Sequence, residues 1–465
     1  MQTAYDEVPY ENLPFTQALP RGHATVAALH GLAPPDPRTA RVLELGCGAG
    51  AHLVGVAAAH PGVRALGVDL AASAIETARE TAAAAGLENV RFDVADVLAL
   101  TDGRLGEFDY VIVHGLYAWA EEPLREAVLA ACRAHLAPDG IVYVSYTANP
   151  GGHLRRMLRE MAQWHARGLV DPRERAERAR GLFALLARLG EAGGPSFYGG
   201  VVGEDVHALA VAPEAMLVHD LLGAAYEPVW FTDFATAAGR HGLAYVGDAI
   251  PESSREPPWS DAVGAFVADG AGDDRIAREQ YLDLLVLRRF RHSLLCHADR
   301  APAARIEPAA VRRLLVAADG DGTALPEPLR AALAGTGPLR PLPFAQLQER
   351  AGVPAGELAE ALVRAFDAGV VAFHAVPPPA AATPGARPRA SPLARSQAQP
   401  GATVTTLLSR LVRITDEPTA ALLRLLDGTR DRAAIREAFP GPLDAETLGA
   451  SLAKFAELGL LCEEG

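Results

Sequence analysis

The alternation of apolar and polar positions between Arg41 and Tyr146 predicts alternating strands and helices. Short apolar, β-branched runs predict strands at 41–45, 64–69, 89–94, 108–113 and 140–146. Amphipathic segments predict helices at 49–59, 71–85 and 121–136, whereas the third connection, 97–104, is short. Because buried strands separated by helices are typical of parallel sheets, we expect a Rossmann-like, doubly wound α/β core. In such a sheet, ligands bind beyond the carboxyl ends of the strands.

The pattern becomes mostly helical after this core. Helical periodicity covers 151–193 and 213–241, with a glycine-rich break at Ser196–Gly203. A strand is predicted at Leu243–Gly247, and Leu282–Leu287 is a candidate for another. Either these two strands complete the core sheet, with 151–240 inserted as a helical cap, or they belong to a separate middle domain.

Two segments near the C-terminus resemble each other, with 357–370 corresponding to 447–460. Each predicts an apolar helix that ends at glycine and runs into a short strand, as at the end of a winged-helix-like α+β unit. Between them, Val376–Ala402 is rich in Pro, Ala and Arg and predicts an extended connector. The expected parts are an N-terminal arm or lid (1–40), the core (41–150), a helical cap and middle domain (151–298), a first winged-helix-like domain (299–375), the connector (376–402) and a second winged-helix-like domain (403–465).

Composition narrows the functional classes. The 465 residues carry a formal net charge of −14, which argues against a general nucleic-acid binder. No apolar run approaches the length of a membrane span, and the N-terminus lacks the pattern of a signal peptide. The four cysteines are too far apart for a metal cluster or a disulfide framework. We therefore expect a cytoplasmic protein, and a homodimer is compatible with the sequence.

A glycine-rich loop follows the first predicted strand, in the stretch Glu44-Leu-Gly-Cys-Gly-Ala-Gly50. Its glycines alternate, unlike the G-x-G-x-x-G of dinucleotide-binding folds, and they let a ligand approach the backbone closely. Glu44 would be awkward beside a pyrophosphate but suits a cationic ligand. S-adenosyl-L-methionine (SAM), which has a sulfonium and an ammonium and no phosphate, fits this pattern. Cys47 is interpreted as a small buried filler and not as a nucleophile.

Acidic residues follow the next two predicted strands. Asp69, followed by Leu70, ends the second strand, where a carboxylate can accept both ribose hydroxyls. Asp96 follows the third strand and can accept from an adenine amino group, while the Val97 N–H caps a ring nitrogen. Asp93 is close enough in sequence to be an alternative to Asp96.

The order of these motifs resembles that of class I SAM-dependent methyltransferases. The motifs are, in chain order, E-L-G-C-G-x-G, V-D, A-D and F-D-Y-V-I-V. The resemblance implies a SAM site made by Glu44, Gly46, Cys47, Gly48, Gly50, Asp69, Leu70, Asp96, Val97 and His114. Flanking motifs resemble bacterial methyltransferases that carry a "methyltransferase regulatory domain", a family that includes rickettsial protein-lysine methyltransferases acting on outer-membrane proteins. These motifs are Tyr5-Asp6, Pro9-Tyr10, Pro14-Phe15, His114–Trp119, Thr147–His153, His219-Asp220, Trp230-Phe231, Arg288–His297 and Leu426–Arg432.

The loop after the fifth strand departs from this family. Where its members have a pattern like N-T-Y-P-G-W-H, this chain has T-A-N-P-G-G-H, with Asn149 and Gly152 in place of Tyr and Trp. An aromatic wall is the expected way to hold a methylammonium group, so its role would shift to Tyr117, Trp119 or Tyr146. His52, where the family often has Asn, is a further pocket candidate.

The expected reaction is in-line methyl transfer, which needs alignment and removal of the nucleophile's proton. The catalytic candidates are His114, Tyr117 and Tyr146. Three hypotheses remain open: N-methylation of protein lysine side chains, methylation of a small molecule in a capped site, and a regulatory or protein-docking role for the C-terminal half. Few basic residues lie on the two repeated helices, only Arg364 and Lys454, so docking to protein is favoured over DNA binding.

Overall fold

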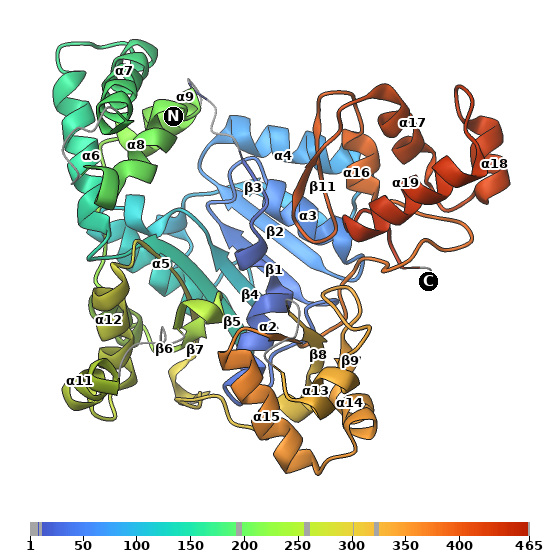
Figure 1. Cartoon of the computed structure of the whole chain (residues 1–465). Helices are drawn as coiled ribbons and strands as arrows, with labels where there is room; N and C mark the ends of the chain where they lie inside the picture. The colour runs from blue at the N-terminus through green and yellow to red at the C-terminus, as the bar shows by residue number, and fades with distance from the viewer. Residues whose placement is uncertain are drawn as a thin grey trace.

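The computed structural model describes residues 8, 12–191, 198–254, 261–300, 302–319 and 325–463. The Tyr5-Asp6 and Pro9-Tyr10 motifs lie outside these described residues. A seven-stranded sheet of order β3-β2-β1-β4-β5-β7-β6 forms the centre of the molecule (Figure 1). Strands β1 to β5 pair in parallel, and β7 runs antiparallel to both β5 and β6. The strands are β1 (Arg41–Leu45), β2 (Arg64–Asp69), β3 (Val90–Val94), β4 (Phe108–Val113), β5 (Leu136–Thr147), β6 (Leu243–Asp248) and β7 (Phe290–His297).

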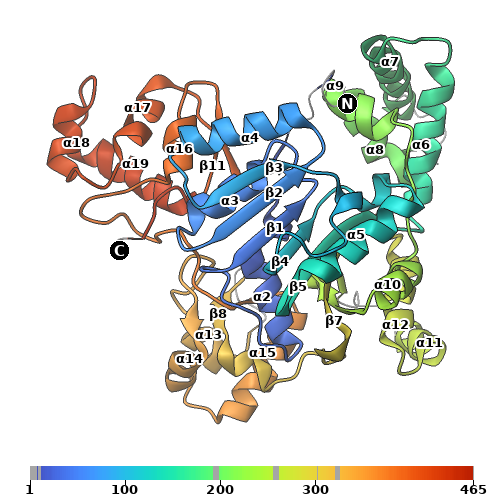
Figure 2. The same ribbon diagram turned by 180° about the vertical axis from the view of Figure 1, so that it is seen from behind.

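Helices cover both faces of this sheet, because its central strands are apolar on both sides. Val42 and Ile112 pack toward one face, and Leu43 and Val111 toward the other, all of them fully buried. The first face is covered by α2 (Pro20–Leu29), α3 (Ala51–Ala59) and α4 (Ala72–Ala84), and the second by α5 (Glu122–His135) and α10 (Phe231–Arg240). Figure 2 shows the same layers from behind. The predicted doubly wound core is therefore confirmed.

A helical cap follows β5, with its own apolar cluster. It contains α6 (Gly152–His165), α7 (Pro172–Glu191), α8 (Gly203–Ala210) and the short α9 (Glu214–Met216). After α10, strand β6 returns to the sheet, α11 (Asp261–Ala271) and α12 (Arg275–Val286) follow, and β7 inserts between β5 and β6. Of the two arrangements left open by the sequence, the structure has the one in which the middle segment completes the core sheet.

The strand predicted at Leu282–Leu287 was wrong. Residues 282–286 form the last turns of α12, and the actual strand, β7, begins at Phe290. Leu282 and Asp283 are buried, whereas residues 284–287 are exposed. The apolar run continues beyond the buried face of the helix, so its composition alone does not distinguish helix from strand.

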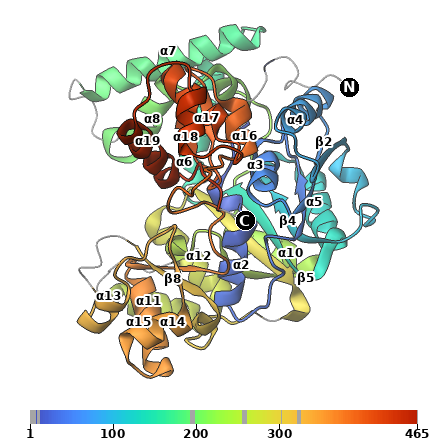
Figure 3. The ribbon, with the colours of Figure 1, turned by 90° about the vertical axis from the view of Figure 1, so that its right-hand side faces the viewer.

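The C-terminal half forms two small α+β units (Figure 3). The first has a sheet of order β10-β8-β9 with strands β8 (Leu315–Ala318), β9 (Leu342–Pro343) and β10 (Val371–His374), and helices α13 (Glu327–Ala332), α14 (Phe344–Ala351) and α15 (Ala355–Asp367). The second contains α16 (Pro392–Gln397), β11 (Thr403–Thr405), β12 (Leu411–Arg413), α17 (Glu417–Leu425), α18 (Arg432–Ala438) and α19 (Ala445–Glu457).

The sequence repeat corresponds to a shared helix ending. After α15, Gly369 has φ +74°, and after α19, Gly459 has φ +73°. In both, the glycine N–H and the next N–H donate back to carbonyls of the last turn, those of Phe366 and Ala365 in the first unit and of Ala456 and Phe455 in the second. The predicted extended connector between the units is wrong at its end, because residues 392–397 form α16, whose Leu393 joins the apolar cluster of the core.

A buried ion pair ties the middle segment to the sheet. Arg291, on β7, is 1% exposed, and its Nε donates to Asp283 Oδ2 of α12 at 2.7 Å. Its Nη2 also donates to Glu279 Oε2 at 2.9 Å, and the guanidinium lies 4.0 Å from the ring centroid of Phe231. Because Asp283 is fully buried, this pairing neutralises a carboxylate that water cannot reach.

We predict that Arg291→Met lowers the free energy of unfolding by about 3–5 kcal/mol, because two buried carboxylates lose their central partner: Glu279 loses this ion pair, and Asp283 keeps only Arg288, whose Nε donates to it at 3.0 Å. Arg41→Met, which removes an exposed pair with Asp109, should change it by less than ~1 kcal/mol. Urea denaturation followed by circular dichroism measures both. Equal effects of the two substitutions would contradict the prediction.

Candidate functional site

The glycine loop is held at the carboxyl edge of the sheet by backbone hydrogen bonds. The Gly46 N–H donates to the Val68 carbonyl at 2.8 Å, and the Gly48 N–H donates to Asp69 Oδ2 at 2.8 Å. Gly46, Gly48 and Gly50 have φ values of +76°, +53° and +73°, a region that L-residues with side chains rarely adopt. Asp69 thus joins the loop after β1 to the end of β2.

Two residues of the loop pack against the sheet. A Cβ at Gly50 would lie 2.6 Å from the ring of Phe92, so no larger residue fits there without displacing β3. Cys47 is 2% exposed, and its sulfur lies 2.8 Å from the place of a Cβ at Gly67. Burial, with the charges of Glu44 and Asp69, raises the pKa of the Cys47 thiol. This geometry supports the interpretation of Cys47 as a filler.

Glu44 is a buried carboxylate beneath the loop. It is 3% exposed, and its Oε2 has no hydrogen-bond partner within the described residues. Burial, together with the negative charge of Asp69, raises the pKa of Glu44 well above its usual value. A cation placed at this oxygen would relieve both effects, so the site fits a ligand with an ammonium group.

The ends of β2 and β3 offer polar and apolar surface for a nucleoside. The two Asp69 oxygens accept from the N–H groups of Gly48 and Ala71, which leaves further lone pairs for ribose hydroxyls. Leu70 is 54% exposed, and its apolar side chain is available to a base. These features fit the adenosine part of SAM.

The two acidic candidates after β3 differ in their surroundings. Asp93 lies 3.6 Å from Arg79 Nη2 of α4. Asp96 is exposed, and its Oδ1 accepts from the Leu98 N–H at 2.9 Å, while Val97 is buried. Because Asp96 has no cationic partner among the described residues, this geometry favours Asp96 over Asp93 as the acceptor for adenine.

The N-terminal segment contacts the same loop, which sequence reasoning did not resolve to particular residues. Asn12 Oδ1 accepts from the Ala51 N–H at 2.6 Å, and its amide donates to the Cys47 carbonyl at 3.3 Å. Phe15 stacks on His114 with ring centroids 3.6 Å apart. His52 is buried, and its Nδ1 accepts from the Phe15 N–H at 3.4 Å, so it holds this segment in place. No local sequence signal marks these contacts, because the partners are 35 or more residues apart.

His114 follows β4 and lies between Phe15 and Tyr143. Its Nδ1 is 3.0 Å from the Tyr143 hydroxyl and 3.3 Å from Ser145 Oγ. Burial lowers the pKa of His114 to about 3, with His52 and His292 acting in the same direction. The imidazole is therefore neutral near pH 7, and its Nδ1 shares a hydrogen bond with the Tyr143 hydroxyl.

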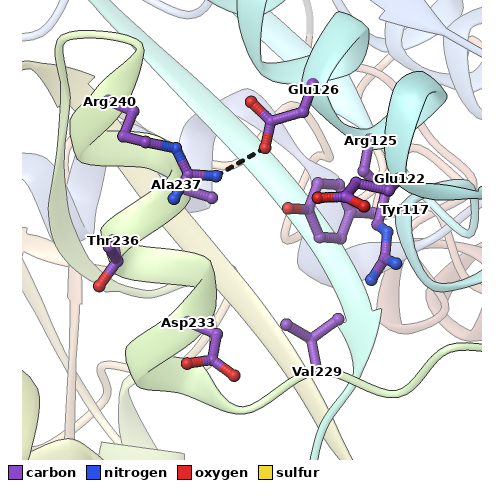
Figure 4. Close-up of a pocket in the computed structure, with 9 residues that line it drawn as sticks. All are labelled: Tyr117, Glu122, Arg125, Glu126, Val229, Asp233, Thr236, Ala237 and Arg240. Carbon is purple, nitrogen blue, oxygen red and sulfur yellow. Dashed lines mark hydrogen bonds and ion pairs between the residues drawn. The ribbon is translucent and has the colours of Figure 1, made fainter.

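Tyr117 and Tyr146 lie on the other face of the sheet. The Tyr146 hydroxyl is 3.0 Å from Ser293 Oγ inside the core, and the ring packs on Phe234 of α10. Tyr117 borders a pocket of about 280 Å³ between α5 and α10, together with Arg125, Glu126, Asp233 and Arg240 among others (Figure 4). The Tyr117 hydroxyl faces this pocket. The structure therefore does not bring Tyr117 and Tyr146 together with His114. The surroundings of the two tyrosines favour packing roles.

The altered loop after β5 is closed by the segment before α10. The Asn149 amide donates to the Pro228 carbonyl at 3.1 Å. A Cβ at Gly152 would lie 2.4 Å from Pro228 Cβ, so a tryptophan does not fit here. Trp119 instead forms an aromatic pair with Tyr226, with ring centroids 5.2 Å apart.

Among the described residues, no group of three or more His, Cys, Asp or Glu side chains is arranged to hold a metal ion. None of the helices in the described part of the chain is long and apolar enough to cross a membrane.

Comparison with known proteins agrees with this architecture. Family models match a methyltransferase domain at residues 42–140, a predicted methyltransferase regulatory domain at 213–297 and a PKMT C-terminal winged helix domain at 386–454. The solved structure of PKMT2 from Rickettsia typhi in complex with AdoHcy superposes with a TM-score of 0.83 at 24% identity, covering 97% of this chain and 100% of that chain.

Two proteins of Rickettsia prowazekii (strain Madrid E) are similar in sequence. Uncharacterized protein RP789 is 32% identical over 300 residues, 63% of this chain and 53% of that protein. Uncharacterized protein RP028 is 30% identical over 235 residues, 50% of this chain and 93% of that protein. The match thus spans about half the length of RP789 and nearly all of RP028.

A parallel sheet with one antiparallel strand, β7, inserted between β5 and β6, and with an acid–glycine loop after β1, defines a class I methyltransferase, and SAM is the cofactor of this class. The chain belongs, with RP028, to the bacterial methyltransferases that carry a methyltransferase regulatory domain.

Glu44 gives the first prediction for this site. Since the Glu44 carboxyl must ionise to face the ammonium of SAM, wild-type affinity should fall as the pH drops from 7.5 to 5.5, by up to about tenfold per unit below its raised pKa. Glu44→Gln should bind SAM about 10–100-fold more weakly at pH 7.5 and lose most of this pH dependence. Isothermal titration calorimetry measures both, with the exposed Glu88→Gln as control. A pH-independent wild-type affinity would refute the pairing.

The two aspartates after β3 give a matched pair of variants. Asp96→Asn should weaken SAM binding by about tenfold, because an amide accepts less strongly from the adenine amino group than a carboxylate does. Asp93→Asn should leave the affinity near that of the wild type, since Asp93 faces Arg79. Calorimetric titration of both variants decides between them, and the reverse order would assign the adenine contact to Asp93.

Proposed function

We propose that this enzyme N-methylates lysine side chains of proteins. The observation that carries the proposal is the match of residues 386–454 to a winged helix domain of PKMTs, together with a fold shared along 97% of the chain with a rickettsial PKMT2. Bound SAM would supply an activated methyl group on its sulfonium. Glu44 would hold its ammonium, Asp69 its ribose, and Asp96 with Val97 its adenine.

In the proposed mechanism, His114 positions groups and does not carry a proton. An imidazole whose pKa is about 3 cannot retain a proton taken from an ammonium near pH 7. Its ring is fixed by Phe15 on one side and by the Tyr143 hydroxyl on the other. It therefore forms a rigid wall beside the end of β4, and the acceptor amine loses its proton to solvent before it is aligned.

An aromatic pair lies beside the altered loop, made by Trp119 from the segment after β4 and Tyr226 from the segment before α10. The Tyr226 hydroxyl donates to the Gly152 carbonyl of that loop at 3.1 Å. Trp119 and Tyr226 already hold a cation, the guanidinium of Arg159. We therefore assign recognition of the acceptor to the cap and not to an aromatic cage on the loop itself.

The test uses purified protein, methyl-labelled SAM and a bacterial lysate. We expect label in protein, recovered as methyllysine after acid hydrolysis. Prior acetylation of the lysate lysines should abolish it, and Glu44→Gln should reduce it at limiting SAM. Label found only in small molecules, or in protein residues other than lysine, would refute the proposal.

A further inference from the structure

Three arginines gather on the first two turns of α6. Arg159 is 3% exposed, and its Cζ lies 4.7 Å from the ring centroid of Tyr226 and 5.2 Å from that of Trp119. Its Nη2 donates to the Gly223 carbonyl at 2.6 Å, and its Nη1 donates to the Asp220 carbonyl. Arg156 Cζ lies 6.0 Å from the same Tyr226 ring. Arg155, one residue earlier, is half-buried.

This arginine cluster (Arg155, Arg156 and Arg159) is incompletely neutralised. Arg156 Nη2 pairs with Glu227 at 3.1 Å, whereas neither Arg155 nor Arg159 makes an ion pair within the described residues. The negative charge of Asp220 acts on the pKa of Arg159 in the opposite direction to burial. The Nε of Arg156 is buried without a hydrogen-bond partner. Like charges this close repel one another, so the cluster is set up to receive an anion.

The electrostatics of the cluster agree with this geometry. Burial lowers the pKa of Arg159 to about 10, with Arg155 and Arg156 acting in the same direction. The chain as a whole has a net charge of −14, so this positive surface is a local exception. Guanidinium groups bind carboxylates with paired N–H donors, and stacking on an aromatic ring fixes their orientation.

The cluster lies beside the place of methyl transfer. Helix α6 starts at Gly152, just beyond the end of β5 at Thr147, and its first two turns extend roughly 11 Å. The Glu227 N–H donates to the Ala118 carbonyl at 2.8 Å, which places the cluster next to the loop after β4 as well. The arginine cluster therefore lies near the ends of both β4 and β5.

We propose that the arginine cluster binds carboxylate side chains that flank the acceptor lysine, so that the enzyme prefers acidic segments of its protein substrates. This inference rests on the proposed function, because that function makes lysine the acceptor. The preference for acidic neighbours of that lysine rests on the arginine cluster. Arg155 and Arg156 meet the acidic side chains, and Arg159 holds the aromatic pair beneath them in place.

Peptide methylation tests the preference. Matched peptides carry one lysine flanked by glutamates or by glutamines. We expect kcat/KM for the glutamate peptide to be at least about tenfold higher at low salt and to fall as salt is added. The double variant Arg155→Gln/Arg156→Gln should reduce this ratio to below about threefold. Arg167→Gln, just beyond the C-terminal end of α6 and over the exposed Trp164 ring, should retain the preference.

A binding measurement separates this inference from the proposed function. A fluorescent glutamate peptide without lysine should bind the wild-type protein and not the double variant, as followed by anisotropy, whether or not any lysine is methylated. Such binding without methyllysine would overturn only the proposed function. Four outcomes would overturn the inference. In the kinetic assay these are equal kcat/KM values for the two lysine peptides, or a preference for the glutamate peptide that survives in the double variant. In the binding assay they are absence of binding, or displacement of the peptide by equimolar free glutarate. Circular dichroism of the double variant checks that the cap remains folded.

Discussion

The cofactor site depends on the position of two carboxylates, Glu44 and Asp69, against the same glycine loop. Asp69 accepts from the Gly48 and Ala71 N–H groups and so fixes the loop after β1 against the end of β2. Glu44 lies buried beneath that loop with an unpaired oxygen, and burial, together with the negative charge of Asp69, raises the pKa of Glu44. The folded chain therefore carries an electrostatic cost here that a cationic ligand removes. The N-terminal segment closes this arrangement, because Asn12 bonds both to the loop and to the start of α3.

The two sides of the reaction centre have opposite charge. Acidic groups lie near the carboxyl ends of β1, β2 and β3, where the proposed cofactor contacts are, and arginines follow β5, on the side proposed for the acceptor. Under the proposed function, such a division would keep the cationic cofactor away from the arginine cluster and let acidic groups of an acceptor approach that cluster. The loss of two aromatics from the loop after β5 is consistent with this division. Pro228 occupies the space beside Gly152, and the aromatic pair of Trp119 and Tyr226 supports Arg159.

Periodicity predicted the core well, because strands buried on both faces and helices with one apolar face leave clear patterns in sequence. The edges of β1, β2 and β4 agree with the predicted ranges 41–45, 64–69 and 108–113. The pattern failed at Leu282–Leu287, where an apolar run extends past the buried face of α12. Proximity to the end of a strand also does not show which face of the sheet a side chain joins, as Tyr117 and Tyr146 illustrate. Successive strand residues point to opposite faces, so neighbours in sequence such as Tyr143 and Tyr146 enter different cores. The contacts of Asn12 and Phe15 join distant segments, which no local pattern specifies.

The C-terminal half is packed against the same helix that begins at the cofactor loop. Helix α3 starts at Ala51, beside Gly50, and a Cβ at Gly55 would lie 3.6 Å from side-chain atoms of both Thr405 and Ser409. Leu393 of α16 belongs to the apolar cluster of the core, and Leu29 of α2 belongs to that of the first C-terminal unit. Because shared apolar clusters resist relative motion, these units are not modules on loose tethers. Their removal would expose apolar surface on α2 and α3, the two helices that hold the N-terminal segment and the glycine loop in place.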